Sequence, residues 1–301
     1  MEQSPKQAGD KLAVNQHEID QPTLNQERAD EIRQNVRESY SEVAEASNSG
    51  GCCGESVSCC GVSDDAAINT LVSTRLGYSE GDLDSVPEGA DMGLGCGNPR
   101  AIASIQHGET VLDLGSGGGF DCFLAAAETG DSGHVIGIDM TPAMISKARS
   151  NAVKGQYKQV EFRLGEIEHM PVANEMVDVI ISNCVINLSP DKNQVFSEAF
   201  RVLKPGGRLA ISDVVASTEL PDELREDLAL YSGCMAGASM ISELHNILES
   251  NGFQDIRIEP KDESKDFIKD WAPGRGVEDY VISATIEAVK PGGCCSGSGC
   301  C

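Results

Sequence analysis

The sequence predicts an α/β fold in which helices cover both faces of a seven-stranded, mostly parallel β-sheet. Two observations support this prediction. From Val111 onward, short apolar segments alternate with amphipathic segments at helical spacing, a pattern typical of parallel strands joined by helices. The first apolar segment also runs directly into a glycine-rich turn that opens the next helical segment.

The expected strands are short apolar segments between turn residues. They lie at 110–115, 134–139, 159–164, 177–183 and 207–213, with two late strands near 253–259 and 280–289. The helices between and after them are expected at 119–129, 142–153, 191–203, 221–232 and 242–250. Pro205-Gly206-Gly207 predicts a helix stop followed by a turn, and Pro221 is expected to open a helix.

The two ends of the chain differ from this core in composition. Residues 1–34 are polar and weakly patterned, so we expect them to be mobile. Val36, Tyr40 and Val43 lie at helical spacing and predict a short amphipathic helix. A Gly/Ser/Cys-rich loop follows, and the final PGGCCSGSGCC has nothing with which to form a core, so it should be a flexible, disordered tail without a ligand.

These changes in composition divide the chain into four parts. Residues 1–60 form a mobile N-terminal segment with the short helix and the Cys-rich loop. Residues 61–215 form the α/β core with its helical lead-in. Residues 216–291 supply further helices and the last strands on the side where a substrate would bind, and residues 292–301 are the Cys-rich tail.

The composition also limits partners and location. The 301 residues carry a net charge of −25, which makes DNA or RNA a poor partner but would accommodate a cationic cofactor. The N-terminal segment lacks the apolar core of a signal peptide, and no apolar run approaches the ~20 residues of a membrane helix. We therefore expect a cytoplasmic protein without a membrane partner, in a compartment where thiols stay reduced.

The use of cysteine is the most informative feature of the chain. Eight of the twelve cysteines form adjacent pairs, at Cys52-Cys53, Cys59-Cys60, Cys294-Cys295 and Cys300-Cys301. Adjacent cysteines make a strained disulfide, and thiolates are soft ligands, so the pattern favours a soft metal or metalloid. The other four lie in the body of the chain, at Cys96, Cys122, Cys184 and Cys234.

Two structural interpretations of these cysteines stay open. The N-terminal pairs could form a zinc site, although Cys53 and Cys59 are separated by GESVS rather than by the two to four residues usual in zinc fingers. A buried cysteine is also often a small core hydrophobe. We keep that interpretation for Cys122. For Cys96, Cys184 and Cys234, each considered alone, a core role and a ligand role are equally open.

The glycine-rich turn indicates a ligand cradle. Gly115 and Gly117 let the backbone approach a ligand closely, but the dinucleotide fingerprint would need a glycine where the chain has Phe120. Asp113 stands two positions before the first of these glycines. Asp139 ends the second strand, where a carboxylate can hold both hydroxyls of a ribose.

This combination resembles the class I S-adenosylmethionine-dependent methyltransferases. Further similarity lies at 165–168, at Ser182-Asn183 and at 201–209, so that the resemblance covers about residues 108–215. It implies a Rossmann-like fold and S-adenosyl-L-methionine as the cofactor. The cofactor-binding residues that it implies are Asp113, Gly115, Ser116, Gly117, Asp139, Met140, Glu166, Ile167 and Asn183.

Three cysteine-bearing segments are more particular within that superfamily. Residues 93–97 (GLGCG), 182–188 (SNCVINL) and 233–238 (GCMAGA), with the Cys-rich loop and tail, look like those of the arsenite methyltransferases. The resemblance implies methyl transfer to thiol-bound trivalent arsenic, hence detoxification, with arsenic held by the catalytic cysteines Cys96, Cys184 and Cys234. It also implies a cysteine from the N-terminal loop, for which Cys52, Cys53 and Cys60 stay open, and a position for Tyr40 over the methionine end of the cofactor, where plain packing is the alternative.

The positions of these cysteines support the resemblance independently. Cys184 follows a strand whose carboxyl end should open onto the ligand crevice of the sheet, and Cys234 lies beyond the fifth strand, where a substrate wall is expected. Three thiolates could replace the hydroxyls of arsenite and leave the arsenic lone pair free to attack a methyl group. That reaction requires no general base.

Other functions and partners are also considered. A methyltransferase for a quinone-type or sterol-type small molecule would leave the thiols without a role, and a non-catalytic metalloid-binding protein is the third possibility. The resemblance implies arsenite or its thiol conjugates as substrate, and thioredoxin or glutathione as the thiol reductant. We expect a monomer, with the cysteine tail acting as a capture arm for arsenic or as a scavenging tail.

Overall fold

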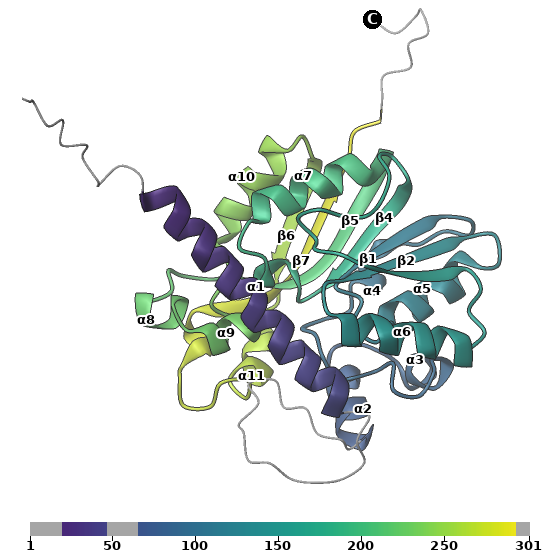
Figure 1. The fold of residues 1–301 in the computed structure, drawn as a ribbon, viewed down its shortest axis with the longest axis horizontal. Coiled ribbons are helices and arrows are strands. Elements are labelled where there is room, and N and C mark those ends of the chain that lie inside the picture. The colour runs from purple at the N-terminus through teal and green to yellow at the C-terminus, as the bar shows by residue number, and fades with distance from the viewer. Residues whose placement is uncertain (1–19, 47–65, 293–301) are drawn as a thin grey trace, which may run out of the picture.

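The computed structural model describes residues 20–46 and 66–292. Within them, seven strands form one sheet in the order β3-β2-β1-β4-β5-β7-β6 (Figure 1). Among these strands β7 alone runs against its neighbours, β5 and β6. The predicted fold class, a seven-stranded and mostly parallel sheet, is therefore confirmed.

Each expected strand is present. The strands are β1 (Thr110–Leu114), β2 (His134–Asp139), β3 (Val160–Leu164), β4 (Val177–Asn183), β5 (Leu203–Ala216), β6 (Gln254–Pro260) and β7 (Val281–Val289). The fifth is longer than expected because it pairs with β7 from Arg208 to Ala216. The turn predicted at Pro205-Gly206-Gly207 is wrong. These residues lie inside β5, where the register against β4 shifts and Gly206 takes a φ of +84°.

The helices show two departures from expectation. The α-helices are α1 (Asp20–Ala46), α2 (Ala66–Arg75), α3 (Glu80–Ser85), α4 (Arg100–Ala103), α5 (Phe120–Thr129), α6 (Pro142–Lys154), α7 (Lys192–Val202), α8 (Asp222–Arg225), α9 (Leu228–Ser232), α10 (Ile241–Ser250) and α11 (Lys265–Ile268). Three short 3-10 helices are η1 (Ile186–Leu188), η2 (Asp262–Ser264) and η3 (Val277–Asp279). The helix expected at 221–232 is two helices, because Asp227 caps the second by accepting hydrogen bonds from the N–H groups of Ala229 and Leu230.

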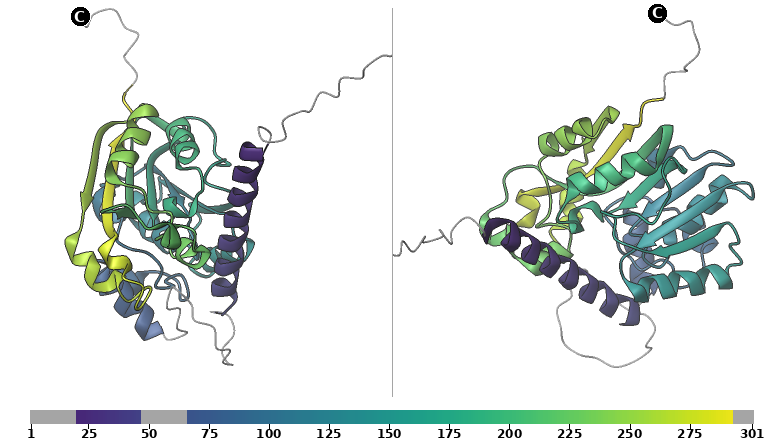
Figure 2. Two further views of the ribbon diagram at one scale, coloured as in Figure 1. Left: turned by 90° about the vertical axis from the view of Figure 1, so that its left-hand side faces the viewer. Right: turned by 45° about the horizontal axis from the view of Figure 1, so that its top comes forward.

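The N-terminal helix is much longer than the short helix predicted around Val36. In α1, residues 20–34, which we expected to be mobile, are helical and lie along one side of the body (Figures 1 and 2). Ile32 and Val36 lie on the buried side of this helix, and its Arg33 pairs with Glu168 at 3.2 Å. The helix is therefore fixed mainly by contacts with distant parts of the chain, which local periodicity does not reveal.

Two apolar layers hold the helices against the sheet. On one face, Phe196 of α7 and Leu248 of α10 pack against strand residues such as Leu112. On the other face, Phe123 of α5 and Ile145 of α6 pack against a separate set of strand side chains. Because the central strands are buried on both faces, they appear in sequence as nearly continuous apolar segments, which explains why they could be predicted.

A third apolar cluster lies beyond the carboxyl ends of the strands. It joins residues of α1 and α9 to the three cysteines Cys96, Cys184 and Cys234. In the sheet, β1 and β4 are neighbours. From β1 the chain continues toward one edge of the sheet through β2 and β3, and from β4 it continues toward the other edge through β5. Sheets of this kind bind ligands at that point, outside the carboxyl ends of the strands.

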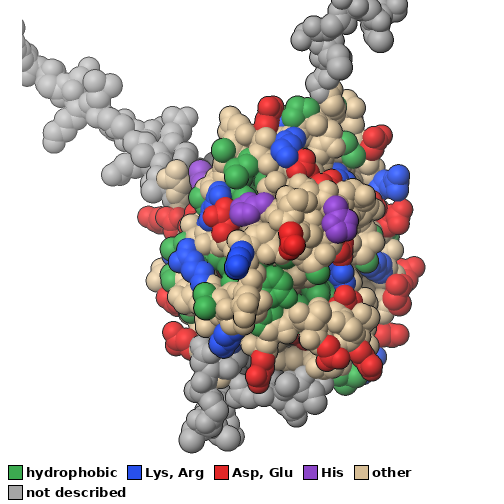
Figure 3. Space-filling view, turned by 90° about the vertical axis from the view of Figure 1, so that its right-hand side faces the viewer, with side chains coloured by type: hydrophobic (Ala, Val, Ile, Leu, Met, Phe, Trp, Pro, Cys, Tyr) green, Lys and Arg blue, Asp and Glu red, His purple; other side chains and the backbone are tan. Residues whose placement is uncertain are grey.

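The outer surface carries the acidic excess of the composition. On the face shown in Figure 3, Lys and Arg side chains are interspersed among Asp and Glu rather than gathered over one element. No helix of the described residues is both long and apolar enough to cross a bilayer.

The packing of α7 gives a test of the core. We expect Phe196→Ala to lower the free energy of unfolding by about 3–5 kcal/mol, because Phe196 is fully buried and its loss leaves a cavity. Val153→Ala is the control, since Val153 is 79% exposed and should change it by less than about 0.5 kcal/mol. Urea denaturation measures both, and equal effects would show that α7 does not pack as described.

Candidate active site

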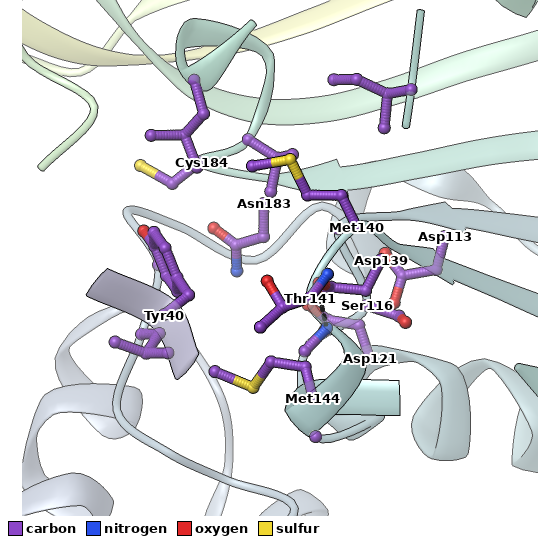
Figure 4. A pocket seen from close by; sticks show the side chains of 18 of the residues that line it. Tyr40, Asp113, Ser116, Asp121, Asp139, Met140, Thr141, Met144, Asn183 and Cys184 are labelled. Atoms are coloured by element: carbon purple, nitrogen blue, oxygen red, sulfur yellow. Dashed lines mark hydrogen bonds between the residues drawn. The ribbon is translucent and has the colours of Figure 1, made fainter. Parts of the chain in front are cut away.

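A large cavity opens at the carboxyl ends of β1, β2 and β4. Its empty space, which includes open solvent, is about 1060 Å³. In Figure 4, Asp113, Asp121 and Asp139 lie on one side of the cavity, and Cys184 lies on the other with Asn183 between them. The structure thus joins the predicted cradle to one of the predicted cysteines.

The glycine-rich turn forms the floor of the cavity. Gly115 has a φ of +72°, and a Cβ there would lie 2.3 Å from a methyl group of Val185, so only glycine allows the turn to lie against the loop that carries Cys184. At Gly117 a Cβ would meet no atom of the described residues within 4 Å. The first glycine therefore permits packing, and the second leaves open space in the cradle.

Asp139 and Ser116 present polar atoms to the cavity. The Asp139 carboxylate accepts hydrogen bonds from the backbone N–H groups of Gly117 at 3.0 Å and Thr141 at 2.8 Å. Burial raises the pKa of Asp139, and these two hydrogen bonds oppose that rise. The Ser116 hydroxyl is buried without a hydrogen-bond partner among the described residues, so a ligand with hydroxyl groups would satisfy it.

Two further carboxyl groups are buried in the wall of the cavity. Burial, followed by the charge of Asp121, raises the pKa of Asp113 well above its usual value. Burial raises the pKa of Asp121 to about 6, although Tyr78 donates a hydrogen bond to it at 2.7 Å. A cation bound nearby would offset the cost of ionising these groups, so the cavity suits a positively charged ligand.

The segment after β3 contributes residues other than those expected. Ile167 lines the cavity as predicted, but Glu166 does not. The Glu166 carboxylate instead pairs with Arg37 of α1 at 3.1 Å and with Arg33 at 3.8 Å. Glu168, two residues further on, lines the cavity in its place and pairs with Arg33.

The other predicted cofactor residues line the cavity. They are Asp113, Gly115, Ser116, Gly117, Asp139, Met140 and Asn183. Residues that sequence reasoning did not single out also do so, namely Asp121, Thr141, Met144 and Glu168. Asp121 and Thr141 had a usable signal: Thr141 directly follows the predicted contact Met140, Asp121 stands four positions after Gly117, and both lie near the N-terminus of a helix. Glu168 lies in the segment 165–168 on which the resemblance to the methyltransferases partly rests, whereas Met144 had no signal.

The three predicted arsenic ligands lie together. Cys96 and Cys184, 88 positions apart in the chain, form a disulfide with their Cα atoms 5.8 Å apart. The Cys234 thiol donates a hydrogen bond to the carbonyl oxygen of Cys184 at 2.6 Å. All three are less than 10% exposed. The expectation that the thiols are reduced is therefore wrong for Cys96 and Cys184 in this structure.

The remaining cysteines lie elsewhere. Cys122 is fully buried on α5, among the apolar residues of the second core layer, and it donates a hydrogen bond to Asp113 at 3.2 Å. The expected core role of Cys122 is confirmed. The N-terminal candidates Cys52, Cys53 and Cys60 lie outside the described residues, as does the Cys-rich tail.

The loops that carry the cysteines are held in unusual backbone conformations. Cys184 and Cys234 have positive φ angles of 58° and 63°, which cost energy for residues other than glycine and occur where the surroundings enforce them. The N–H of Cys184 donates to the carbonyl of Ser212 at 2.8 Å. Asp213 then accepts the N–H of Ile186 at 2.9 Å, which fixes the residues that follow Cys184.

Asn183 connects the cavity to the disulfide. Its side-chain oxygen accepts the N–H of Cys96 at 3.0 Å, and its amide donates to the carbonyl of Gly97 at 2.8 Å and to the hydroxyl of Tyr78 at 3.1 Å. Tyr78 in turn donates to Asp121. A continuous hydrogen-bonded chain thus runs from a carboxyl group in the cavity to the backbone of Cys96.

A second cavity adjoins the first. Its empty space, which includes open solvent, is about 950 Å³, and its lining includes Cys184, Cys234, Phe267 and Trp271. Cys184 and Tyr40 belong to the lining of both cavities, and the Tyr40 hydroxyl donates to the carbonyl of Ser232 at 3.3 Å. Cys184 therefore stands where the contents of the two cavities would meet.

Comparisons with known proteins agree with this geometry. Residues 105–252 match the family described as a methyltransferase domain. Over 274 residues the chain is 52% identical to an arsenite methyltransferase of Halobacterium salinarum, covering 87% of this chain and 67% of that one. Over 210 residues it is 43% identical to an arsenite methyltransferase of Aquipseudomonas alcaligenes, covering 67% of this chain and 55% of that one. The chain thus spans two thirds of the first relative and about half of the second.

A solved structure is similar as well. The crystal structure of an arsenic(III) S-adenosylmethionine methyltransferase from Chlamydomonas reinhardtii matches with a TM-score of 0.55 and 33% sequence identity. The match covers 73% of each chain.

The Asn183 contacts lead to a test of how the cysteines are brought together. We expect Asn183→Ala to slow re-formation of the Cys96–Cys184 disulfide at least about tenfold after reduction, because Cys96 loses the hydrogen bond that orients it. Disulfide formation in a glutathione buffer, followed by peptide mass spectrometry, measures the rate. Asn193→Ala is the control, since its side chain contacts Asn251 on the surface. An unchanged rate for Asn183→Ala would show that Asn183 does not orient Cys96.

Proposed function

The chain belongs to the arsenite methyltransferase family, and we propose that it transfers methyl groups from S-adenosylmethionine to thiol-bound trivalent arsenic. The observation that carries the proposal is the position of Cys184, which lines both the cradle and the second cavity and contacts the other two cysteines. An enzyme that methylates arsenic needs its cysteines beside the cofactor cradle, because the methyl donor and the arsenic must be in contact.

The cradle has the polar groups that the cofactor requires. Asp139 and the unpartnered Ser116 hydroxyl suit the hydroxyls of a ribose, and the open space at Gly117 allows close approach of a ligand. Asp113 and Asp121 suit the positive charge of the methionine end. When bound, S-adenosylmethionine supplies a methyl group activated by a sulfonium.

The three cysteines supply the arsenic site. Each thiol that binds arsenite replaces one hydroxyl, and its proton leaves with that hydroxyl as water, so three thiols release three waters. The lone pair on arsenic stays available as the nucleophile. The carbon–arsenic bond would form as the carbon–sulfur bond breaks, with S-adenosylhomocysteine as the leaving group and the positive charge passing to arsenic, so no side chain has to accept a proton. The contribution of the chain is positioning, which can lower a barrier by roughly 7–11 kcal/mol.

Binding through all three cysteines requires prior reduction. Because Cys96 and Cys184 are joined in the structure, two electrons and two protons must be supplied before both can bind arsenic. We propose a thiol reductant, thioredoxin or glutathione, as the source. Cys234 must also give up its hydrogen bond to the carbonyl of Cys184 to become a ligand.

Helix α1 completes the chamber around the reaction. Val36 and Tyr40 line the cofactor cavity from this helix, and Arg33 ties it to the opposite wall through Glu168. This arrangement shields one side of the cavity from solvent. A methyltransferase for an organic acceptor, the alternative considered from sequence, leaves the cysteine cluster without a role, and no observation favours it.

The thiol chemistry gives the main functional test. We expect Cys184→Ser to lower arsenite methylation at least about a hundredfold, equivalent to about 2.7 kcal/mol of transition-state stabilisation, while S-adenosylmethionine still binds. Labelled cofactor, arsenite and glutathione, followed by arsenic speciation, measure the reaction. Cys122→Ser controls for the loss of a buried thiol and should keep most of the activity. Retained methylation in Cys184→Ser would contradict the assigned thiol site.

The buried acids predict how cofactor binding depends on pH. Because burial raises the pKa of Asp121 to about 6, this group loses its negative charge as the pH falls through 6. The cationic cofactor binds the ionised form more strongly, so its affinity should fall as the pH falls through 6. Calorimetric titration between pH 5 and 8 measures this.

A variant isolates the contribution of Asp121 to this dependence. Asp121→Asn should bind the cofactor about tenfold more weakly at pH 7.5 and show a smaller change between pH 7.5 and pH 5 than the parent. Asp131→Asn, an exposed substitution, should behave like the parent protein. A pH profile that Asp121→Asn leaves unchanged would exclude Asp121 as its source.

A further inference from the structure

Asp213 is a buried carboxylate that the proposed reaction does not use. One ligand atom from each of Cys96, Cys184 and Asp213 lies within 4.8 Å of the other two, and all three residues are buried. Asp213 follows Ser212 on β5, and the Ser212 carbonyl accepts the N–H of Cys184, so the pairing of β4 with β5 places the carboxylate beside the sulfur atoms.

Hydrogen bonds fix the Asp213 side chain in this position. One carboxylate oxygen accepts the amide of Asn187 at 2.9 Å and the N–H of Val214 at 2.7 Å. The other oxygen accepts the N–H of Ile186 at 2.9 Å. The backbone N–H of Asn187 is a further donor to this carboxylate, which offers about four acceptor positions, so a cation bound to Asp213 would replace one of these hydrogen bonds.

Cys234 belongs to a different arrangement. Its thiol is directed to the carbonyl of Cys184, and it is not part of the group formed by Cys96, Cys184 and Asp213. Reduction of the disulfide alone would leave two thiols and a carboxylate in place. Recruiting Cys234 instead requires its hydrogen bond to break.

We propose that, when the disulfide is reduced, Cys96, Cys184 and Asp213 form a binding site for a divalent cation of the zinc class. Zinc binds cysteine sulfur and aspartate oxygen at ~2.0–2.3 Å in tetrahedral geometry, with ligand atoms roughly 3.3–3.8 Å apart, which small side-chain movements would provide here. Two thiolates and a carboxylate bring three negative charges, and the nearby Lys192 brings one positive charge. A divalent cation offsets most of that charge, whereas arsenic held by three thiolates is a neutral centre.

The cation and arsenite would then compete for two shared ligands. Cys96 and Cys184 serve both, and the third ligand distinguishes them, as Asp213 for the cation and Cys234 for arsenic. Binding of the cation releases the two thiol protons and leaves the fourth coordination position to water. Zinc would therefore inhibit arsenite methylation competitively, an expectation that rests on the proposed function, whereas the binding site itself does not.

Cobalt(II) is the probe for the test, because its thiolate charge-transfer absorption reports how many thiolates bind it. The full chain is used with its eight paired cysteines changed to serine, so that they do not bind the cation. The substitutions are at Cys52, Cys53, Cys59, Cys60, Cys294, Cys295, Cys300 and Cys301. In the reduced protein we expect one cobalt per chain with two thiolate ligands, and Cys184→Ser should abolish that signal.

Two variants separate the cation site from the arsenic site. Asp213→Asn should weaken cobalt binding at least about tenfold more than it weakens arsenite binding, which it affects only through the loop after Cys184. Cys234→Ser should weaken arsenite binding at least about tenfold and change cobalt affinity less than threefold. Equal cobalt affinity in Asp213→Asn and its parent would overturn the proposal.

The Cys234→Ser spectrum decides independently of whether Asp213→Asn folds. An unchanged cobalt spectrum supports the Asp213 site, and loss of one thiolate ligand overturns it. In the parent, competitive inhibition by zinc supports the shared ligands. If arsenite is not methylated even without zinc, the proposed function fails, while the cobalt result still decides the cation site.

Discussion

The pairing of β1 with β4 is the constraint on which the rest of the site depends. It places the glycine-rich turn that follows β1 directly against the loop that follows β4. Gly115 has no side chain, so Val185 fits against it, and the neighbouring Cys184 then lies at the wall of the cofactor cavity. A sheet with another strand order would build the same cradle and the same cysteine without bringing them together.

Buried charge shapes the site in two places. Around the cradle, Asp113 and Asp121 are carboxyl groups whose pKa is raised because water cannot solvate the ionised form. Beside the disulfide, burial raises the pKa of Asp213 to about 6. Ionising the carboxyl groups in either place costs free energy, and a nearby cation lowers that cost. The protein thus keeps carboxyl groups where a cationic ligand would stabilise their ionised form, at a cost to the stability of the ligand-free fold.

The parts of this structure that sequence predicts are those with a local cause. The central strands are apolar on both faces, and the glycine turn has a fixed pattern, so both were predicted closely. The grouping of Cys96, Cys184 and Cys234 came from resemblance to a family, and the fold brings these residues together. Their contacts with one another come from loop conformations and strand register that no local pattern encodes.

The errors arose where distant contacts decide the structure. Helix α1 is long because Arg33 and Arg37 pair with acids more than a hundred residues away, which a weak apolar periodicity does not indicate. The same pairing draws Glu166 toward α1, whereas it had been expected in the cofactor site. The Cys96–Cys184 disulfide could not be foreseen either, because the two cysteines are 88 positions apart.

Arsenic K-edge X-ray absorption of the reduced protein with one equivalent of arsenite tests the central proposal most directly, because it counts the atoms bound to arsenic. The eight paired cysteines should be serine in this measurement, so that arsenic is held by the body of the chain alone. Three sulfur neighbours in this protein, and two sulfurs with one oxygen in Cys234→Ser, are the result that the proposed site predicts. Fewer than three sulfur neighbours in this protein, or a spectrum that Cys184→Ser leaves unchanged, would contradict it.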